Sequence, residues 1–338
     1  MTPPLPLAAR FLLDAQDEFL RAIDHLPAPG RGGSLGRLNA AGWVIAHLAS
    51  AHDVWINVTV AGNERDPWAA QWAERQSAAT LASPLATPFA EARDAYLAIA
   101  GRATEVVQSL DAAALARELH TPRGVFTAGY FVARAPGHLL AHAGELAVIG
   151  ALVTAPELDL PGALPRLADP PAEVEANPNI APLIVRLLLD ARHEFQRTID
   201  ALPAPAASGA ITRVHPGAVT IAEVANHEDR VWRVEAQRLA PDTWSGASIT
   251  QRAPGQEIPT FDDAHAAYQR AVEGSASYLE GLRADDLARP LGASTVGAEA
   301  VRSAGLLFAR AGELNALASL FEAPDIGLPG ALARTAER

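Results

Sequence analysis

The 338-residue sequence contains no cysteine. The chain therefore has no disulfide, no thiolate metal ligand and no cysteine nucleophile, and any thiol chemistry must use a thiol supplied from outside. No stretch approaches the roughly 18 uninterrupted apolar residues that a membrane helix needs. The N-terminus lacks a basic region and carries acidic residues from Asp14 onward, unlike a secretory signal. We therefore expect a cytoplasmic protein that does not enter a membrane.

Positive charge is also scarce, with 27 Lys and Arg against 39 Asp and Glu and a net charge of −12. This balance opposes binding to a phosphate backbone, and no basic stripe offsets it, so we expect no nucleic-acid partner. The sequence has no Gly-rich phosphate loop, no G-x-S-x-G and no H-E-x-x-H. Nothing in it therefore supports a kinase, a serine hydrolase or a zincin.

Three sequence segments occur twice, in the same order. Residues 11–29, 89–100 and 142–164 return as residues 187–205, 261–272 and 310–332. Such ordered self-similarity indicates an internal duplication. We place one domain at 1–164, a second at 179–332, and a linker rich in proline and acidic residues at 165–178.

Helical periodicity dominates both domains. In the first helix of each, apolar residues recur every four positions, at Leu7, Phe11, Ala15, Phe19 and Ile23 and at Leu183, Leu187, Ala191, Phe195 and Ile199. Three more helices are predicted in each domain, at 40–62, 87–110 and 127–153 and at 218–239, 260–283 and 296–321. No alternating pattern suggests a strand, and residues 62–87 suit a long connection. The sequence predicts an all-α protein of two tandem four-helix bundles.

Three histidines of the first domain are candidate metal ligands. His138 and His142 lie four residues apart on one predicted helix, so their rings project from one face about one turn apart. His47 occupies the inward face of another predicted helix. Three imidazoles suit a catalytic metal, because a three-ligand site keeps positions open. The alternative is that these are hydrogen-bonded core histidines, which is the commoner role of a buried histidine.

The second domain provides an internal control, because positions 138 and 142 correspond there to Leu306 and Arg310. His227 is its candidate for the position of His47. This domain cannot build the same site, so we expect one metal per chain. Residues that persist in both domains are expected to have structural or supporting roles, as in the pairs Gly144 and Gly312, Glu145 and Glu313, and Arg134 and Arg302.

Two residues that precede the histidine pair are candidate substrate contacts. Arg134 lies one helical turn before His138 and is placed to hold an anionic group of a substrate, with a salt bridge to a nearby acid as the alternative. Tyr130 lies a further turn away, where the helix face drifts toward the rim of a pocket.

The segments "AAGWVIAHLASAHDVW" and "GYFVARAPGHLLAHAGELAVIGAL" resemble the DinB/YfiT-like superfamily of four-helix bundles. The resemblance covers residues 7–155 and implies that His47, His138 and His142 bind a divalent metal such as zinc or nickel. Several relatives are S-transferases or isomerases that use mycothiol, bacillithiol or glutathione, which implies a low-molecular-weight thiol as cosubstrate. The second domain departs from the pattern at Leu306 and Arg310.

Two classes of function follow from these features. The first is a metal-dependent thiol S-transferase, or a related isomerase or lyase, that acts on a small molecule at the histidine site. The second is a non-catalytic small-molecule-binding or scaffold protein that uses the bundle cavity without metal chemistry. Because single-domain relatives pair as homodimers, we expect an intramolecular pseudo-dimer, present as a monomer or as a homodimer of the whole chain.

Overall fold

The computed structural model of the protein describes residues 5–78, 86–162, 181–209, 214–239, 259–324, 326–330, 332 and 334–336. Helices make up most of this part of the chain, which confirms the all-α class. The predicted linker at 165–178 lies outside the described residues. No helix in the described ranges is both long enough and apolar enough to cross a membrane.

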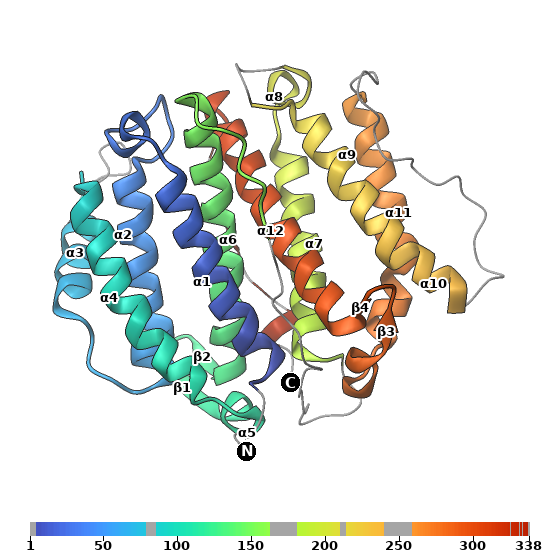
Figure 1. Cartoon of the computed structure of the whole chain (residues 1–338), viewed down its shortest axis with the longest axis horizontal. Coiled ribbons are helices and arrows are strands. Elements are labelled where there is room, and N and C mark those ends of the chain that lie inside the picture. Colours follow the sequence, from blue (N-terminus) through green and yellow to red (C-terminus); the bar gives the residue numbers. More distant parts are fainter. Residues whose placement is uncertain are drawn as a thin grey trace.

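The N-terminal half of the chain, from α1 to α6, contains four long helices. These are α1 (Leu7–His25), α2 (Ala41–His52), α4 (Phe89–Gln108) and α6 (Ala128–Leu152). Helix α1 packs on α6 and α2 packs on α4, and α2 continues directly into a π-helical segment, η2 (Asp53–Val60). These helices form the blue-to-green part of Figure 1.

The C-terminal half, from α7 to α12, repeats this order of helices. Its long helices are α7 (Leu183–Ala201), α9 (Gly217–Glu228), α11 (Phe261–Gly281) and α12 (Val296–Leu320). Helix α9 leads through η3 (Asp229–Arg233) into α10 (Val234–Leu239). Here α7 packs on α12 and α9 packs on α11.

The apolar stripes predicted from the sequence form the core. All five stripe residues of α1 are fully buried, and those of α7 are at most 7% exposed. Burial of such a stripe supplies most of the stability of a helix in a bundle, because isolated helices of this length are marginal in water. The stripes therefore fix which face of α1 meets α6 and which face of α7 meets α12.

Shorter elements depart from the prediction in two ways. The connection at 62–87 contains a helix, α3 (Pro67–Ala78), and the expectation of no strands was wrong at two small antiparallel hairpins. One pairs β1 (Glu118–Thr121) with β2 (Gly124–Thr127), and the other pairs β3 (Pro290–Leu291) with β4 (Ser294–Thr295). The remaining short helices are α5 (Ala112–Ala116), α8 (Ala204–Ser208), η1 (Ala28–Arg31), η5 (Ala284–Ala288) and η6 (Arg334–Ala336).

Each hairpin ends in a threonine that caps the helix after it. The Thr127 hydroxyl accepts a hydrogen bond from the Tyr130 backbone N–H at 3.2 Å, and Thr295 does the same for Ala298. Such a cap satisfies one of the free N–H groups in the first helical turn. The hairpins thereby set where α6 and α12 begin.

The two halves meet where α6 and α12 cross, near the centre of Figure 1. A Cβ on Gly144 would overlap the carbonyl oxygen of Ala309, and a Cβ on Gly312 would overlap that of Ala141. The contact is reciprocal, because positions 141 and 309 correspond, as do 144 and 312. Glycine at both positions allows the closest approach of the two helix backbones.

Candidate metal centre

The three predicted histidines converge in the N-terminal half. Ligand atoms of His47, His138 and His142 all lie within 4.8 Å of one another. The Nε2 atoms of His47 and His138 are 3.0 Å apart. Because α6 places His138 and His142 one turn apart on one face, and α2 presents His47 to that face, three imidazoles meet at one point.

A carboxylate orients one of the three rings. Glu145 accepts a hydrogen bond from Nδ1 of His142 at 2.8 Å, and the Asn39 amide donates to the same carboxylate at 3.1 Å. Metal-binding histidines commonly donate one ring N–H to such a partner, which fixes the tautomer and leaves the other nitrogen free. Glu145 therefore has the supporting role that its persistence as Glu313 predicted, and the free nitrogen of His142 is Nε2.

Tryptophans enclose the other two rings. Trp43 stacks on His47 with ring centroids 5.1 Å apart and planes 5° apart, and the Trp55 ring lies 5.0 Å from that of His138. His138 is only 5% exposed. The indoles thus limit the rotation of two imidazoles and keep water from one side of the cluster.

Burial keeps these imidazoles in the form that binds metals. Burial, with a smaller effect of His142, lowers the pKa of His47 from 6.5 to about 3. Burial also lowers the pKa of His138 well below 6.5, and the neighbouring His47 and His142 add to this effect. Only neutral imidazole has a lone pair for a metal. Both rings therefore remain competent ligands at any pH near neutrality.

The geometry of the cluster fits a divalent ion. Two nitrogens that each lie about 2.0–2.1 Å from one tetrahedral zinc are roughly 3.3 Å apart. The 3.0 Å between the Nε2 atoms of His47 and His138 is close to that separation. Nδ1 of His138 is buried with no partner among the described residues, so no hydrogen bond on that side holds this ring in place. Three neutral nitrogens are a donor set that zinc and nickel accept.

The structure places Arg134 beside the cluster. Its guanidinium lies 5.0 Å from the ring centroid of Trp55, and its charge contributes to lowering the pKa of His138. It donates hydrogen bonds to the carbonyls of Gly330 at 2.8 Å and Pro329 at 3.2 Å. A loop of the C-terminal half therefore holds Arg134 in place.

Tyr130 lies further along α6, toward its first turn. It stacks on Phe126 with centroids 4.7 Å apart and meets Phe131 edge to face. Its substrate contact stays a prediction, as does that of Arg134.

The C-terminal half holds an ion cluster at the corresponding positions. Helices α2 and α9 are both twelve residues long, so positions 176 residues apart correspond and Glu223 takes the place of His47. Arg310, in the place of His142, bonds Glu313 at 2.7 and 2.8 Å and lies 3.5 Å from Glu223. We call Arg310, Glu313 and Glu223 the arginine cluster.

The assignment of His227 as the counterpart of His47 was wrong. His227 lies one turn beyond Glu223 on α9, and its Nε2 lies 2.8 Å from the Ser303 hydroxyl. That prediction relied on the shared residue type. The alignment of α2 with α9 instead places Glu223 at the position of His47. Sequence reasoning also missed Asn39 and the Pro329–Gly330 carbonyls, because these contacts join segments far apart in the chain and leave no periodic signal.

Comparison with known protein families identifies a match to the N-terminal half. The family model described as the DinB superfamily matches residues 8–146, from the first turn of α1 to just beyond Glu145. The match covers somewhat less than half of the chain and includes all three histidines. No curated protein matches the chain, and no solved structure does.

Proposed function

We propose that the N-terminal half of this chain, a member of the DinB superfamily, is the catalytic half of a metal-dependent enzyme whose active site contains His47, His138 and His142. The observation that carries this proposal is the meeting of three imidazoles, two of them with pKa values lowered by burial, beside a carboxylate that orients the third. A purely structural histidine cluster does not need a ring held in a metal-binding tautomer, as Glu145 holds that of His142.

Zinc or nickel is the expected metal, and the proposed reaction is thiol S-transfer or a related isomerisation or elimination on a small molecule. A divalent ion bound by three nitrogens lowers the pKa of a thiol or water in its open positions. The thiol must be a separate small molecule, because the chain has no cysteine. Resemblance to thiol-dependent relatives favours such a cosubstrate.

The residues around the histidines have separate tasks in this proposal. Glu145 keeps His142 in the tautomer that exposes Nε2, and Trp43 and Trp55 exclude water from the flank of the site. Arg134 uses two of its five N–H groups on the Pro329 and Gly330 carbonyls, so the others can bind an anionic group of the substrate. Tyr130 would contact the substrate at the rim.

The C-terminal half supports this site as the second member of a fused pair. We infer a gene duplication, followed by packing of the two copies as an intramolecular pseudo-dimer that is monomeric in solution. The reciprocal Gly144–Ala309 and Gly312–Ala141 contacts support this inference, because a two-fold symmetric interface uses the same residues on both partners. Native mass spectrometry should give the 35.4 kDa mass of one chain.

Metal analysis tests the proposed site. Wild type, purified without a histidine tag, should hold one zinc or nickel per chain, and His142→Ala should lose it. The matched control is Arg310→Ala, which alters the corresponding position of the C-terminal half and should retain the metal. A wild-type protein that cannot be loaded with metal would refute the proposal.

Calorimetry on the loaded protein then tests the thiol. Mycothiol, bacillithiol and glutathione are each titrated into wild type and into His142→Ala. Binding of one of them to wild type alone supports S-transfer chemistry. Metal without any thiol binding would favour the small-molecule-binding alternative for this half.

A further inference from the structure

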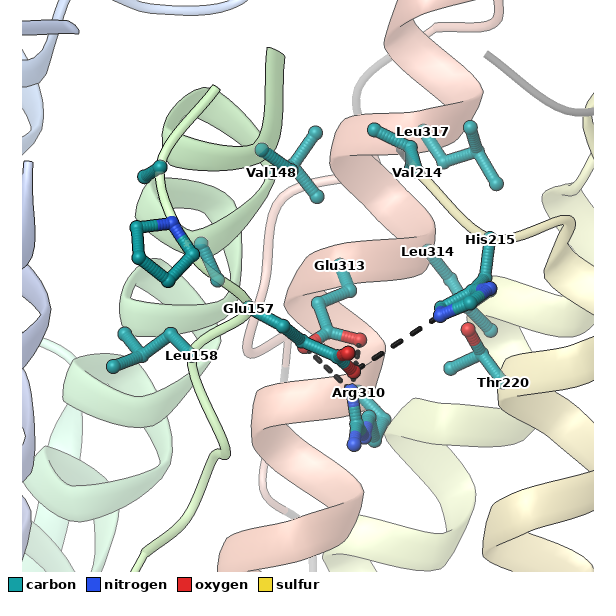
Figure 2. Close-up of a pocket in the computed structure, with 14 residues that line it drawn as sticks. Val148, Glu157, Leu158, Val214, His215, Thr220, Arg310, Glu313, Leu314 and Leu317 are labelled. Atoms are coloured by element: carbon teal, nitrogen blue, oxygen red, sulfur yellow. Dashed lines mark hydrogen bonds and ion pairs between the residues drawn. The ribbon is translucent and has the colours of Figure 1, made fainter. Parts of the chain in front are cut away.

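A pocket of about 320 Å³ lies between the two halves, next to the arginine cluster. One side is formed by the end of α6 and the segment after it, including Val148 and Leu158, and the other by α9 and α12, including Leu314 and Leu317. Figure 2 shows these side chains facing the same space. A volume of this size is at the lower end for small-molecule sites, which indicates a compact ligand.

The pocket is lined by apolar side chains and, at its base, by charged side chains. Val148, Leu158, Leu314 and Leu317 provide apolar surface, whereas Arg310 and Glu313 lie at the base. Their side chains are only 16% and 14% exposed. A ligand that fits must therefore combine an apolar body with a group that the charged residues accept.

Negative charge is in excess at this pocket. The Arg310 guanidinium already has Glu313 and Glu223 as partners. A third carboxylate, Glu157, enters from the segment after α6 and lies 4.0 Å from His215, as Figure 2 shows. Among the charged residues that line the pocket, the carboxylates of Glu157 and Glu313 outnumber the single guanidinium of Arg310, so the local potential favours a cationic ligand.

The direction of the pKa shift of Glu313 agrees with this charge balance. Burial raises the pKa of Glu313; Arg310 opposes the shift, and Glu223 and Glu157 add to it. One guanidinium thus does not fully compensate the buried acid. A second cation near Glu313 and Glu157 would complete the compensation.

The glutamate of the N-terminal half that corresponds to Glu313 has a different partner. There Asn39 donates to Glu145, whereas the C-terminal half has His215 at the corresponding position, directed to Glu157 instead. Glu313 lines the pocket without that amide cap.

We propose that this pocket binds a small organic cation, a primary ammonium group on a short apolar body. The ammonium lies between Glu157 and Glu313, and the apolar body contacts Val148, Leu314 and Leu317. The site is separate from the metal centre and does not rest on its proposed activity. The buried Nε of Arg310, which has no acceptor among the described residues, would instead suit a carboxylate ligand, and the experiment compares the two directly.

Calorimetry with matched probes tests the charge preference. Hexylamine and hexanoate have the same apolar chain and opposite charges, and hexanol is the uncharged control. Hexylamine should bind wild type about tenfold or more tightly than the other two, since charge-assisted hydrogen bonds contribute about 1.5–3 kcal/mol. Preferential binding of hexanoate, or no binding of hexylamine, would overturn the proposal.

Variants locate the binding site. Glu157→Gln keeps the shape of an exposed side chain but removes its charge, and should weaken hexylamine binding about tenfold. Ala151→Phe fills the pocket and should abolish binding, whereas Glu273→Gln, on the exposed face of α11, should leave it unchanged. Equal affinities in wild type, Glu157→Gln and Ala151→Phe would place the amine elsewhere and refute the assignment.

The metal-site variant separates this proposal from the proposed function. His142→Ala should lose metal but bind hexylamine as wild type does. Loss of both would make the pocket dependent on the metal centre and contradict the independence stated above.

Discussion

The two halves of the chain have chemically different side chains at corresponding helix positions. The N-terminal half has Gln16, His47, His52 and His142 where the C-terminal half has Arg192, Glu223, Glu228 and Arg310. Amide and imidazole groups in one half are therefore replaced by arginine and glutamate in the other. Both solutions avoid an isolated buried charge, which would be far more costly than either.

Among the described residues, three potential metal ligands of the histidine type meet only in the N-terminal half, and the difference shows why. Gln16 lies 3.0 Å from the His52 ring nitrogen, whereas Arg192 donates to Glu228 at 2.8 Å. The imidazoles at 47 and 142 keep lone pairs directed at one point, and the arginine cluster already has a cation there. In the C-terminal half the positive charge next to Glu313 is the guanidinium of Arg310.

Introduction of three histidines into the C-terminal half should produce the largest change in the difference between the halves. We expect the triple substitution Glu223→His, Leu306→His and Arg310→His to raise the metal content from one ion per chain to two. The reason is that α9 and α12 offer the same backbone positions as α2 and α6, and Glu313 can orient the new ring at 310 as Glu145 orients His142. Metal analysis of the purified variant measures the result.

The control for the triple variant is the pair of substitutions without Glu223→His, which supplies only two nitrogens and should stay at one ion. A triple variant that folds but binds a single ion would show that the second half differs in backbone geometry as well as in side chains.

Removal of a buried arginine should cost more than removal of the corresponding glutamine. Arg192→Met leaves Glu228 buried without its cation, and we expect a loss of about 3–5 kcal/mol in the free energy of unfolding. Gln16→Met removes only neutral hydrogen bonds to His52 and Thr104, at about 1–2 kcal/mol. Urea denaturation of both variants gives the comparison, and equal losses would mean that the charge of Arg192 has little influence.

Substitution of the glycine at the crossing of α6 and α12 should destabilise the protein equally in either half. Gly144→Ala and Gly312→Ala each place a Cβ against a backbone carbonyl oxygen, so we expect each to lose about 3 kcal/mol of stability. Gly101→Ala is the control, because nothing lies near its added Cβ and alanine favours a helix by about 1 kcal/mol. Clearly unequal losses of stability in the two variants would contradict a reciprocal contact between α6 and α12.

Much of the fold was predictable because long helices carry a repeated signal. The stripe through Phe11 and Phe19 marked α1, and the histidine pair marked the inner face of α6. The hairpins were missed because strands of two to four residues are too short for a visible alternation. Helix α3 was missed because its sequence, with few buried positions, has only a weak stripe.

The metal centre was predictable to the level of its ligands and no further. Spacing on a helix fixes the relation of His138 to His142, the inward face of a second helix added His47, and the DinB resemblance supported all three. The contact of Arg134 with Pro329 and Gly330 depends on how two halves pack, which no local pattern records. The same holds for the pocket beside Arg310, since its lining comes from three separate segments, at 147–158, 214–220 and 310–317.

The smallest expected effect is the pH dependence that the buried His52 gives to the N-terminal half. Burial lowers the pKa of His52 from 6.5 to about 4. Below pH 6.5 the unfolded chain takes up a proton at this residue and the folded chain does not, so stability falls as the pH drops from 6.5 toward 4. His52→Gln removes this titration, whereas the corresponding Glu228 in the other half offers no such histidine.

Urea denaturation of metal-free protein at pH 7 and pH 5 measures this effect. The loss of stability between the two pH values should be smaller in His52→Gln than in wild type by at most about 2 kcal/mol, because each pH unit contributes about 1.4 kcal/mol. The buried His47 and His138 remain in both proteins, so the difference between them isolates His52. Parallel curves would show that His52 is protonated in the folded state, and the N-terminal half would then not rely on neutral imidazoles at that position.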